Sequence, residues 1–233
     1  MLEVFADNWL LFLIGQYPYG PLGGFAMTII ISLASIAAAL PLGVVLALMR
    51  LSESRLLSRP AYVVIQTMRG TPIILLIFWV YFIIPMITGY SVSGAMTTIA
   101  ALVLYKAAFI AEIVRGAILA LPRGQTEAAK ALGLRYHHIT LLIVLPQALY
   151  NSVPSLITQM VGIVKDSSLG YIIGTNELTF AANQVNANLM TQPFNVYMIL
   201  GLIYFAFNFS LATLARAIEK RMGASRRPVA AGT

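Results

Sequence analysis

The sequence predicts an all-α membrane protein with five transmembrane helices. Of its 233 residues, 59% are hydrophobic and only 10% are charged, and the mean hydropathy is +0.84. A soluble domain could not bury that much apolar surface, so lipid is the expected solvent for most of the chain. Each predicted span exceeds the roughly 20 residues needed to cross a hydrocarbon core. The five spans are Phe25–Met49, Ala61–Ile87, Ala95–Leu121, Ile139–Val164 and Pro193–Ala215.

The orientation of these spans follows from the positions of Lys and Arg. With the N-terminus outside, the segments predicted to be external are residues 1–24, 88–94 and 166–192, and they contain no Lys or Arg. The internal segments contain Arg50, Arg55, Arg59, Arg123, Lys130, Arg135, Arg216, Lys220, Arg221, Arg226 and Arg227. Because cytoplasmic loops carry the positive excess, the chain is predicted to run N-out and C-in.

Three regions are expected along the chain. Residues 1–24 form an extracytoplasmic interfacial segment, because the apolar patch Trp9–Ile14 is too short to span the membrane. Residues 25–215 form the five-span transmembrane domain. Residues 216–233 form a basic cytoplasmic tail.

A small-residue, glycine-containing segment separates the third and fourth spans. Pro122 can begin a helix that continues to Gly133, where a sharp turn would lead into a second short helix, Arg135–Leu141. Small alanine side chains would let another protein's surface approach closely. The residues alone leave a second interpretation open, an ordinary basic loop.

The segment matches a longer pattern: E-A-A, three residues, G, nine residues, then I-x-L-P. The matching residues are Glu127, Ala128, Ala129, Gly133, Ile143, Leu145 and Pro146. In this pattern the chain resembles the integral-membrane permease subunits of type I ABC importers. The stretches "RGTPIILLIFWVYF" (Arg69–Phe82) and "KDSSLGYIIGTNEL" (Lys165–Leu178) resemble the polar amino-acid permeases, the histidine, glutamine and glutamate-aspartate uptake group.

That resemblance implies a permease subunit of an ATP-driven importer for polar amino acids in the bacterial inner membrane, working by alternating access. Residues 122–138 would form short cytoplasmic coupling helices that dock on an ATPase. The implied partners are two ABC ATPase subunits, a second permease copy or a related permease, an extracytoplasmic amino-acid-binding protein and membrane lipid, with no nucleic acid.

The chain itself is not expected to be an enzyme. It has no G-x-x-x-x-G-K-[ST] sequence, so ATP and Mg are expected in the partner ATPase. It has no Cys, and its only histidines are His137 and His138. We therefore expect no catalytic residue, bound cofactor or metal on this chain.

Charged residues at membrane depth are costly and are candidates for function. Glu112 and Arg115, spaced i, i+3, are predicted to form a structural ion pair. Lys106 lies near the middle of the third span and has no acidic residue at i±3 or i±4. Asp166 is either its structural partner or the second half of a substrate site, since a free amino acid carries both an ammonium and a carboxylate.

The substrate cavity of the family lies between the helices that flank the coupling segment. By position, the resemblance gives as substrate-contacting residues Tyr105, Lys106, Phe109, Thr158, Gln159, Gly162, Lys165 and Asp166. Two further candidates are Arg69, which begins the family's R-G-T-P stretch, and Ser167, whose hydroxyl could hydrogen-bond a ligand or join helices. Arg69 has an equally good interpretation as a structural residue that shapes a gate. We expect the charge of Lys106 to favour an acidic or other polar amino acid.

Two other functions fit parts of the sequence. The same architecture could import another small solute, such as methionine or a quaternary amine. Alternatively, the chain could be a membrane assembly protein that transports nothing.

Overall fold

The computed structural model describes the backbone of residues 1–224 and the side chains of residues 1–220. This part of the chain is all-α and contains no β-strand, as predicted. The helices are α1 Leu2–Ile14, α2 Gly24–Leu51, α3 Arg55–Gly70, α4 Ile73–Thr88, α5 Gly94–Leu119, α6 Arg123–Ala131, α7 Tyr136–His138, the π-helical η1 Ile139–Val144, α8 Leu145–Asp166, the 3-10 helical η2 Ser167–Ile173, α9 Leu178–Leu189 and α10 Pro193–Ala224.

Four of the predicted spans correspond to helical stretches that are long and apolar enough to cross a membrane. These stretches are Gly24–Leu51, Gly94–Leu119, Tyr136–Ile173 and Pro193–Lys220. The number rises to five if α3 and α4 together count as one span. The prediction of five spans therefore depends on the broken pair.

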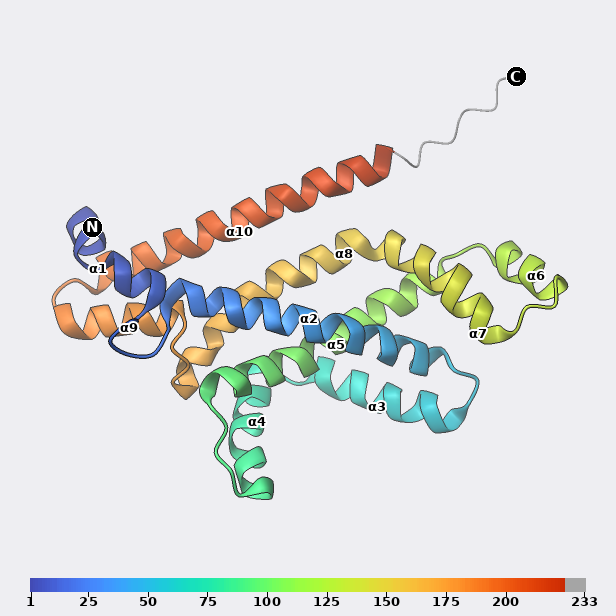
Figure 1. Cartoon of the computed structure of the whole chain (residues 1–233), viewed down its shortest axis with the longest axis horizontal. Helices are drawn as coiled ribbons and strands as arrows, with labels where there is room; N and C mark the ends of the chain where they lie inside the picture. The colour runs from blue at the N-terminus through green and yellow to red at the C-terminus, as the bar shows by residue number, and fades with distance from the viewer. Residues whose placement is uncertain (225–233) are drawn as a thin grey trace.

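The second predicted span, Ala61–Ile87, is not the single kinked helix expected from its sequence. α3 ends at Gly70, α4 begins at Ile73, and the two helices are bent by 112°. Thr71, between them, is extended at φ −98° and ψ 133°. The following Pro72 explains this, because its ring disfavours the helical conformation at the preceding residue and it has no N–H to donate. In Figure 1, α4 projects away from the bundle while α3 lies along it.

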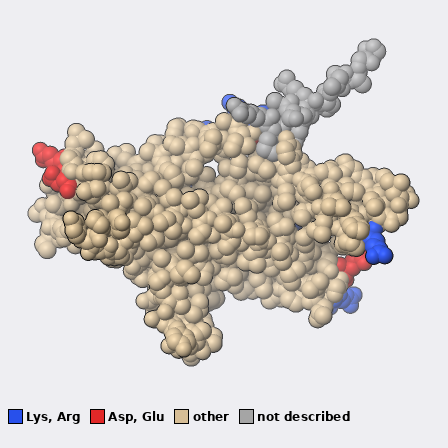
Figure 2. Space-filling view, viewed as in Figure 1, with Lys and Arg blue, Asp and Glu red and all other residues tan. Residues whose placement is uncertain are grey.

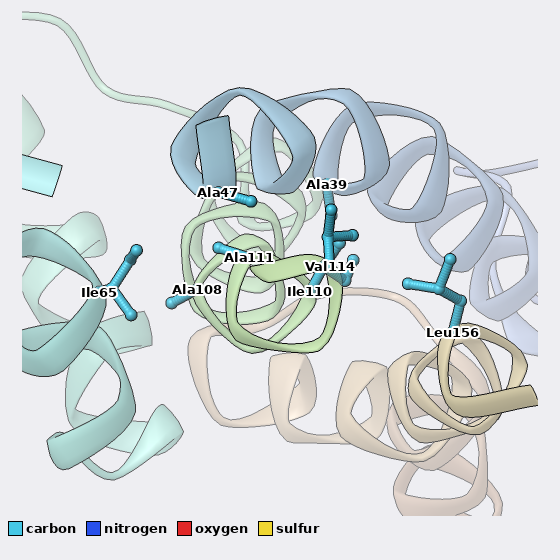
Figure 3. Close-up of a cluster of buried hydrophobic side chains, with 8 residues drawn as sticks. All are labelled: Ala39, Ala47, Ile65, Ala108, Ile110, Ala111, Val114 and Leu156. Carbon is cyan, nitrogen blue, oxygen red and sulfur yellow. The ribbon is translucent and has the colours of Figure 1, made fainter. Parts of the chain in front are cut away.

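α5 is the central helix of the molecule. It contacts α2, α3, α4 and α8, and its contact with α2 is the most extensive in the structure. Figure 3 shows the buried cluster around it, formed by Ala39, Ala47, Ile65, Ala108, Ile110, Ala111, Val114 and Leu156. Half of these residues are alanines. Small side chains let helix backbones approach closely. In a membrane this close packing drives helix association, because lipid tails are as apolar as the helix surface and burial against them gains little.

α2 and α5 approach each other closely at Gly43. A Cβ atom at this position would lie 2.5 Å from Ile110 Cγ2 and 3.0 Å from the Ala107 carbonyl oxygen. No side chain fits without moving one of the two helices. Glycine here therefore fixes the distance between the first and third spans.

A second cluster lies at the end of the molecule that carries α1 and α9 (Figure 1). Val4 and Phe12 of α1 pack there with α9 and the beginning of α10. α1 covers Leu2–Ile14, longer than the apolar patch Trp9–Ile14 on which the interfacial segment was predicted. α9 was not predicted at all. Its buried residues, Leu178, Ala181, Ala182 and Val185, have the i, i+3, i+4, i+7 spacing of an amphipathic helix, so the sequence carried a signal that the prediction missed. This apolar face packs against α1 and α10.

The last helix is longer than the span predicted from the sequence. α10 continues past Ala215 to Ala224, so the first part of the predicted basic tail is helical. Residues 225–233 of that tail, with Arg226 and Arg227, lie outside the described residues.

Charged side chains concentrate at the two ends of the molecule. The face in Figure 2 has acidic groups at the α1 end and both basic and acidic groups at the opposite end, and apart from basic atoms at its upper edge the surface between them is uncharged. A long body with an uncharged middle has the surface expected of a chain that crosses a membrane.

Gly43→Val is expected to lower the free energy of unfolding by about 1–3 kcal/mol, because the added side chain must displace Ile110 or the α5 backbone. The thermal midpoint in detergent measures this. Gly201→Val is the matched control, since nothing lies within 4 Å of a Cβ atom there. Equal destabilisation by the two glycine variants would contradict the close approach.

Candidate functional site

The first candidate site is the segment between α5 and α8. α6 forms over Arg123–Ala131 as predicted, with Pro122 at its N-cap. Gly133 is left-handed at φ +76° and carries the turn that ends the helix. Its N–H donates to the Lys130 carbonyl at 2.9 Å, and Leu134 N–H donates to the Ala129 carbonyl at 3.2 Å. These two bonds satisfy carbonyl groups at the end of α6. The left-handed conformation at position 133 favours glycine, because glycine has no Cβ atom.

The second short helix predicted here, Arg135–Leu141, is not a separate element. Helix resumes at Tyr136 and continues without a break through α7, η1 and α8, so these residues form the beginning of the fourth span. The backbone is π-helical over Ile139–Val144. Pro146 lies directly after this segment and cannot donate the hydrogen bond that a helical residue gives four positions back. The widened turn is the local adjustment to that loss.

α6 is held against the beginning of the fourth span by two contacts. Ala129 and Ile139 are the buried residues of α6 and η1, two elements that touch. Gln147 Nε2 donates to Gln125 Oε1 at 2.6 Å across the same junction.

The matched motif residues divide between this junction and the surface. Glu127, Ala128, Gly133 and Pro146 are exposed, while Ile143 and Leu145 are half-buried. Leu132, between them in the sequence, is 81% exposed at this end of the molecule. The turn therefore presents an apolar side chain and small residues outward on a rigid support.

The second candidate site lies between α5 and α8. Lys106 Nζ is 2.7 Å from Asp166 Oδ2, so the two residues form an ion pair. The sequence had left open whether they pair with each other or bind substrate. The Lys106 side chain is 8% exposed and that of Asp166 is 30% exposed. A buried lysine requires such a partner at this depth. Each charge is neutralised by the other, which leaves no net charge at the pair.

Gly162 makes room for this ion pair. A Cβ atom on Gly162 would lie 3.0 Å from Lys106 Nζ, and no other group lies within 4 Å of it. Gly162 was predicted as a substrate-contacting residue by position, and in the structure it faces the lysine.

A second charged cluster lies further along α5. Glu112 and Arg115 form the predicted ion pair: Arg115 Nε lies 3.1 and 3.2 Å from the two carboxylate oxygens, and its Nη2 donates to Oε2 at 2.8 Å. Arg69, at the end of α3, joins the pair with Nη1 3.8 Å from Glu112 Oε2 and lies over the Phe109 ring at 5.5 Å. Glu112 thus connects the α3–α4 break to α5, a contact that no spacing in the sequence predicts.

Of the remaining predicted residues, Tyr105 and Phe109 lie side by side on α5, whereas Thr158, Gln159 and Ser167 lie at other positions in α8 and η2. The Tyr105 ring lies 5.0 Å from that of Phe109 and 5.7 Å from Lys106 Nζ, so these side chains connect the two charged clusters. Thr158 donates to the Pro154 carbonyl, and Gln159 is half-buried beside it in α8. Ser167 is fully buried and donates to the Val164 carbonyl, so its hydroxyl proton is not available to a ligand.

A buried carboxyl group that the sequence did not single out lies at the α1 end. Glu177 is 0% exposed, and its carboxylate accepts from the N–H groups of Thr179 and Phe180 at the start of α9 and from the Tyr204 hydroxyl of α10. Burial raises the pKa of Glu177 from 4.5 to about 7, against the lowering effect of these hydrogen bonds. The group joins α9 to α10, and among residues 1–220 it has no cationic partner.

Lys106→Met and Asp166→Asn are each expected to lower the free energy of unfolding by about 2 kcal/mol, because each leaves one charge in the span without its partner. The double variant should lose less than the sum of the two. A double-mutant cycle of denaturation free energies in detergent measures the coupling. Strict additivity would contradict the pairing.

The raised pKa of Glu177 predicts a specific dependence of the free energy of unfolding on pH. Between about pH 4.5 and 7 the folded protein keeps a proton that the unfolded chain has released, so stability falls as the pH rises through this window, by about 3 kcal/mol. Glu177→Gln should remove this part of the pH dependence, as read from thermal midpoints between pH 4.5 and 8. Glu53→Gln, at an exposed position, is the control. Parallel curves for the wild type and Glu177→Gln would contradict the prediction.

Comparison with known proteins agrees with this geometry. Residues 39–224 match the family described as "Binding-protein-dependent transport system inner membrane component". The chain is 35% identical over 210 residues to the inner membrane amino-acid ABC transporter permease protein YhdY of Escherichia coli, covering 88% of this chain and 57% of that protein. It is 37% identical over 230 residues to the glutamate transport system permease protein GluD of Corynebacterium glutamicum, covering 95% and 82%.

A solved structure of an amino acid ABC transporter with histidines has the same fold, with a TM-score of 0.78 and 25% identity over 94% of both chains. The chain spans about half the length of the first curated relatives that it matches, 57% and 48%. The family match nevertheless covers most of this chain. The chain is a multi-pass inner-membrane protein and belongs to the binding-protein-dependent transport system inner membrane component family.

Proposed function

We propose that the chain is the permease subunit of an ATP-driven importer of polar amino acids. The observation that carries this proposal is the α6–Gly133 turn, which displays small and apolar residues at one end of the molecule while Ala129 and the Gln125–Gln147 contact fix it to the fourth span. A partner that moves this turn moves α8 with it. The relatives named as amino-acid, glutamate and glutamine permeases support the substrate class.

The proposal includes the orientation and the partners. The N-terminus and α9 lie outside and the α6 turn inside, as the distribution of Lys and Arg predicts. An ABC ATPase carrying ATP and Mg binds residues 122–138, and an extracytoplasmic binding protein delivers the amino acid. A second permease subunit supplies the other wall of the pathway. Alternating access then follows from movement of the two permease subunits about the site.

The test is co-expression with the neighbouring ATPase and binding protein, reconstitution into vesicles, and ATP-driven uptake of a panel of labelled amino acids. The variant E127A/G133A should retain its fold and lose most uptake together with ATPase binding, because Ala at a φ of +76° is strained and the turn shifts. E53A/G201A makes the same two types of substitution at exposed positions outside this turn and should retain uptake.

Normal uptake and ATPase binding by E127A/G133A would disprove the coupling role alone. If the wild-type chain binds no ATPase and moves no amino acid, the importer function is wrong, and a membrane assembly protein becomes the better interpretation.

A further inference from the structure

α8 and α10 enclose a groove of about 450 Å³ that contains none of the residues of the Lys106–Asp166 pair. Val161, Phe205 and Phe209 form its apolar walls. Lys165, Ser168 and Asn208 contribute the polar groups. The volume is in the range of small-molecule sites, and a mostly apolar lining with a few polar groups is their usual composition.

Lys165 brings an uncompensated positive charge to this groove. Its neighbour in sequence, Asp166, is already paired with Lys106 at 2.7 Å. Among residues 1–220, Lys165 has no ion pair of its own, and its side chain is exposed. Lys165 lies at the outer end of the predicted fourth span, beside the segment proposed to be external, so its ammonium reaches water and is accessible to a ligand that enters the groove.

Asn208 brings an unsatisfied acceptor to the same groove. The residue is 8% exposed, and its Nδ2 donates to the Tyr204 carbonyl at 2.8 Å. Its Oδ1 is buried and has no hydrogen-bond partner within the described part of the chain. Buried polar atoms are normally paired, so one without a donor beside a groove indicates a donor that enters from outside. Ser168 Oγ donates to the Lys165 carbonyl at 2.6 Å, which leaves the oxygen free to accept.

We propose that this groove is the binding site for the transported amino acid, with Lys165 on a carboxylate and with Asn208 Oδ1 and Ser168 Oγ accepting from the α-ammonium group. This inference rests on the function proposed above and assigns its substrate site. One cation and two neutral acceptors are the kinds of partner that a carboxylate and an ammonium group need. Because the polar groups of the groove include no carboxylate, it should select acidic and neutral polar amino acids over basic ones.

The proposal moves the site from the position predicted by resemblance. Lys106 and Asp166 satisfy each other, so a ligand that binds there must first break a 2.7 Å ion pair. In the described part of the chain, by contrast, Lys165 has no ion pair and Asn208 Oδ1 has no hydrogen-bond donor. Only Lys165 of the predicted residues remains a ligand in this proposal, and α10 contributes a residue that was not predicted.

The experiment measures equilibrium binding of tritiated L-glutamate, L-glutamine and L-arginine to the permease–ATPase complex in lipid nanodiscs, without the binding protein. Lys165→Met should weaken binding of glutamate and glutamine by about tenfold or more, because a charge-assisted contact is lost. Asn208→Leu should weaken both by a similar factor. Lys165→Glu should reverse the preference and favour arginine, a change that general damage to the fold cannot produce.

Arg59→Met is the matched control, since it removes a cation from an exposed position on α3 and should leave all three affinities unchanged. The measurements are made with neutral lipid alone and with 30% anionic phosphatidylglycerol. Unchanged affinities in Lys165→Met and Asn208→Leu, with wild-type binding and uptake intact, would overturn this site but not the importer function.

A phospholipid in the groove is the other distinguishable result. In that case native mass spectrometry would detect phosphatidylglycerol on the wild type and not on Lys165→Met, while amino-acid binding would be the same in both. That result would overturn the inference. Failure of the wild type to bind or import any amino acid would instead disprove the proposed function itself.

Discussion

Close packing of small residues around α5 is the constraint on which the rest of the structure depends. Hydrophobic burial cannot hold helices together in lipid, so contact between backbones must do so. Gly43 and the alanines of α2 and α5 allow that contact. α5 has α2, α3, α4 and α8 as neighbours, and its far end leads into α6. A movement of α6 is therefore passed directly to the helix on which the bundle is built.

The charges inside the membrane follow the same central helix. Lys106 connects α5 to the end of α8, and Glu112 connects it to Arg115 and to Arg69 at the α3–α4 break. Tyr105 and Phe109 fill the space between them. These pairs neutralise most of the charge, which a low-dielectric environment requires. The groove between α8 and α10 is different, since within residues 1–220 Lys165 has no ion pair and Asn208 Oδ1 has no hydrogen-bond partner.

The α1 end of the molecule is held by polar contacts of another kind. Glu177 caps α9 and accepts from Tyr204, while Thr28 of α2 accepts from the N–H group of Leu178. α9 and α10 thus meet at the buried carboxyl group of Glu177, and α2 joins them at the next residue, Leu178. Tyr204 also lines the groove between α8 and α10, so the contacts that position α9 also position one wall of the proposed site.

The sequence by itself determined the features that depend on local pattern. Apolar runs define the spans, because a membrane helix must satisfy its backbone within one continuous segment. The i, i+3 spacing defined the Glu112–Arg115 pair, and Gly133 defined the turn after α6. The motif spacing identified the family to which the chain belongs.

Only the tertiary structure decided the features that depend on contacts between distant residues. Pro72 predicts a bend, but the 112° angle depends on how α3 and α4 pack against α5. The apolar spacing of α9 is that of a helix, but only the structure shows that its apolar face packs against α1 and α10. The partner of Lys106 and the lack of a partner for Asn208 Oδ1 likewise depend on which helices lie side by side. Local sequence determines where a helix can form. Whether a charge is paired and a space is filled depends on which helices pack together, so the free energy of those contacts is decided only in the tertiary structure.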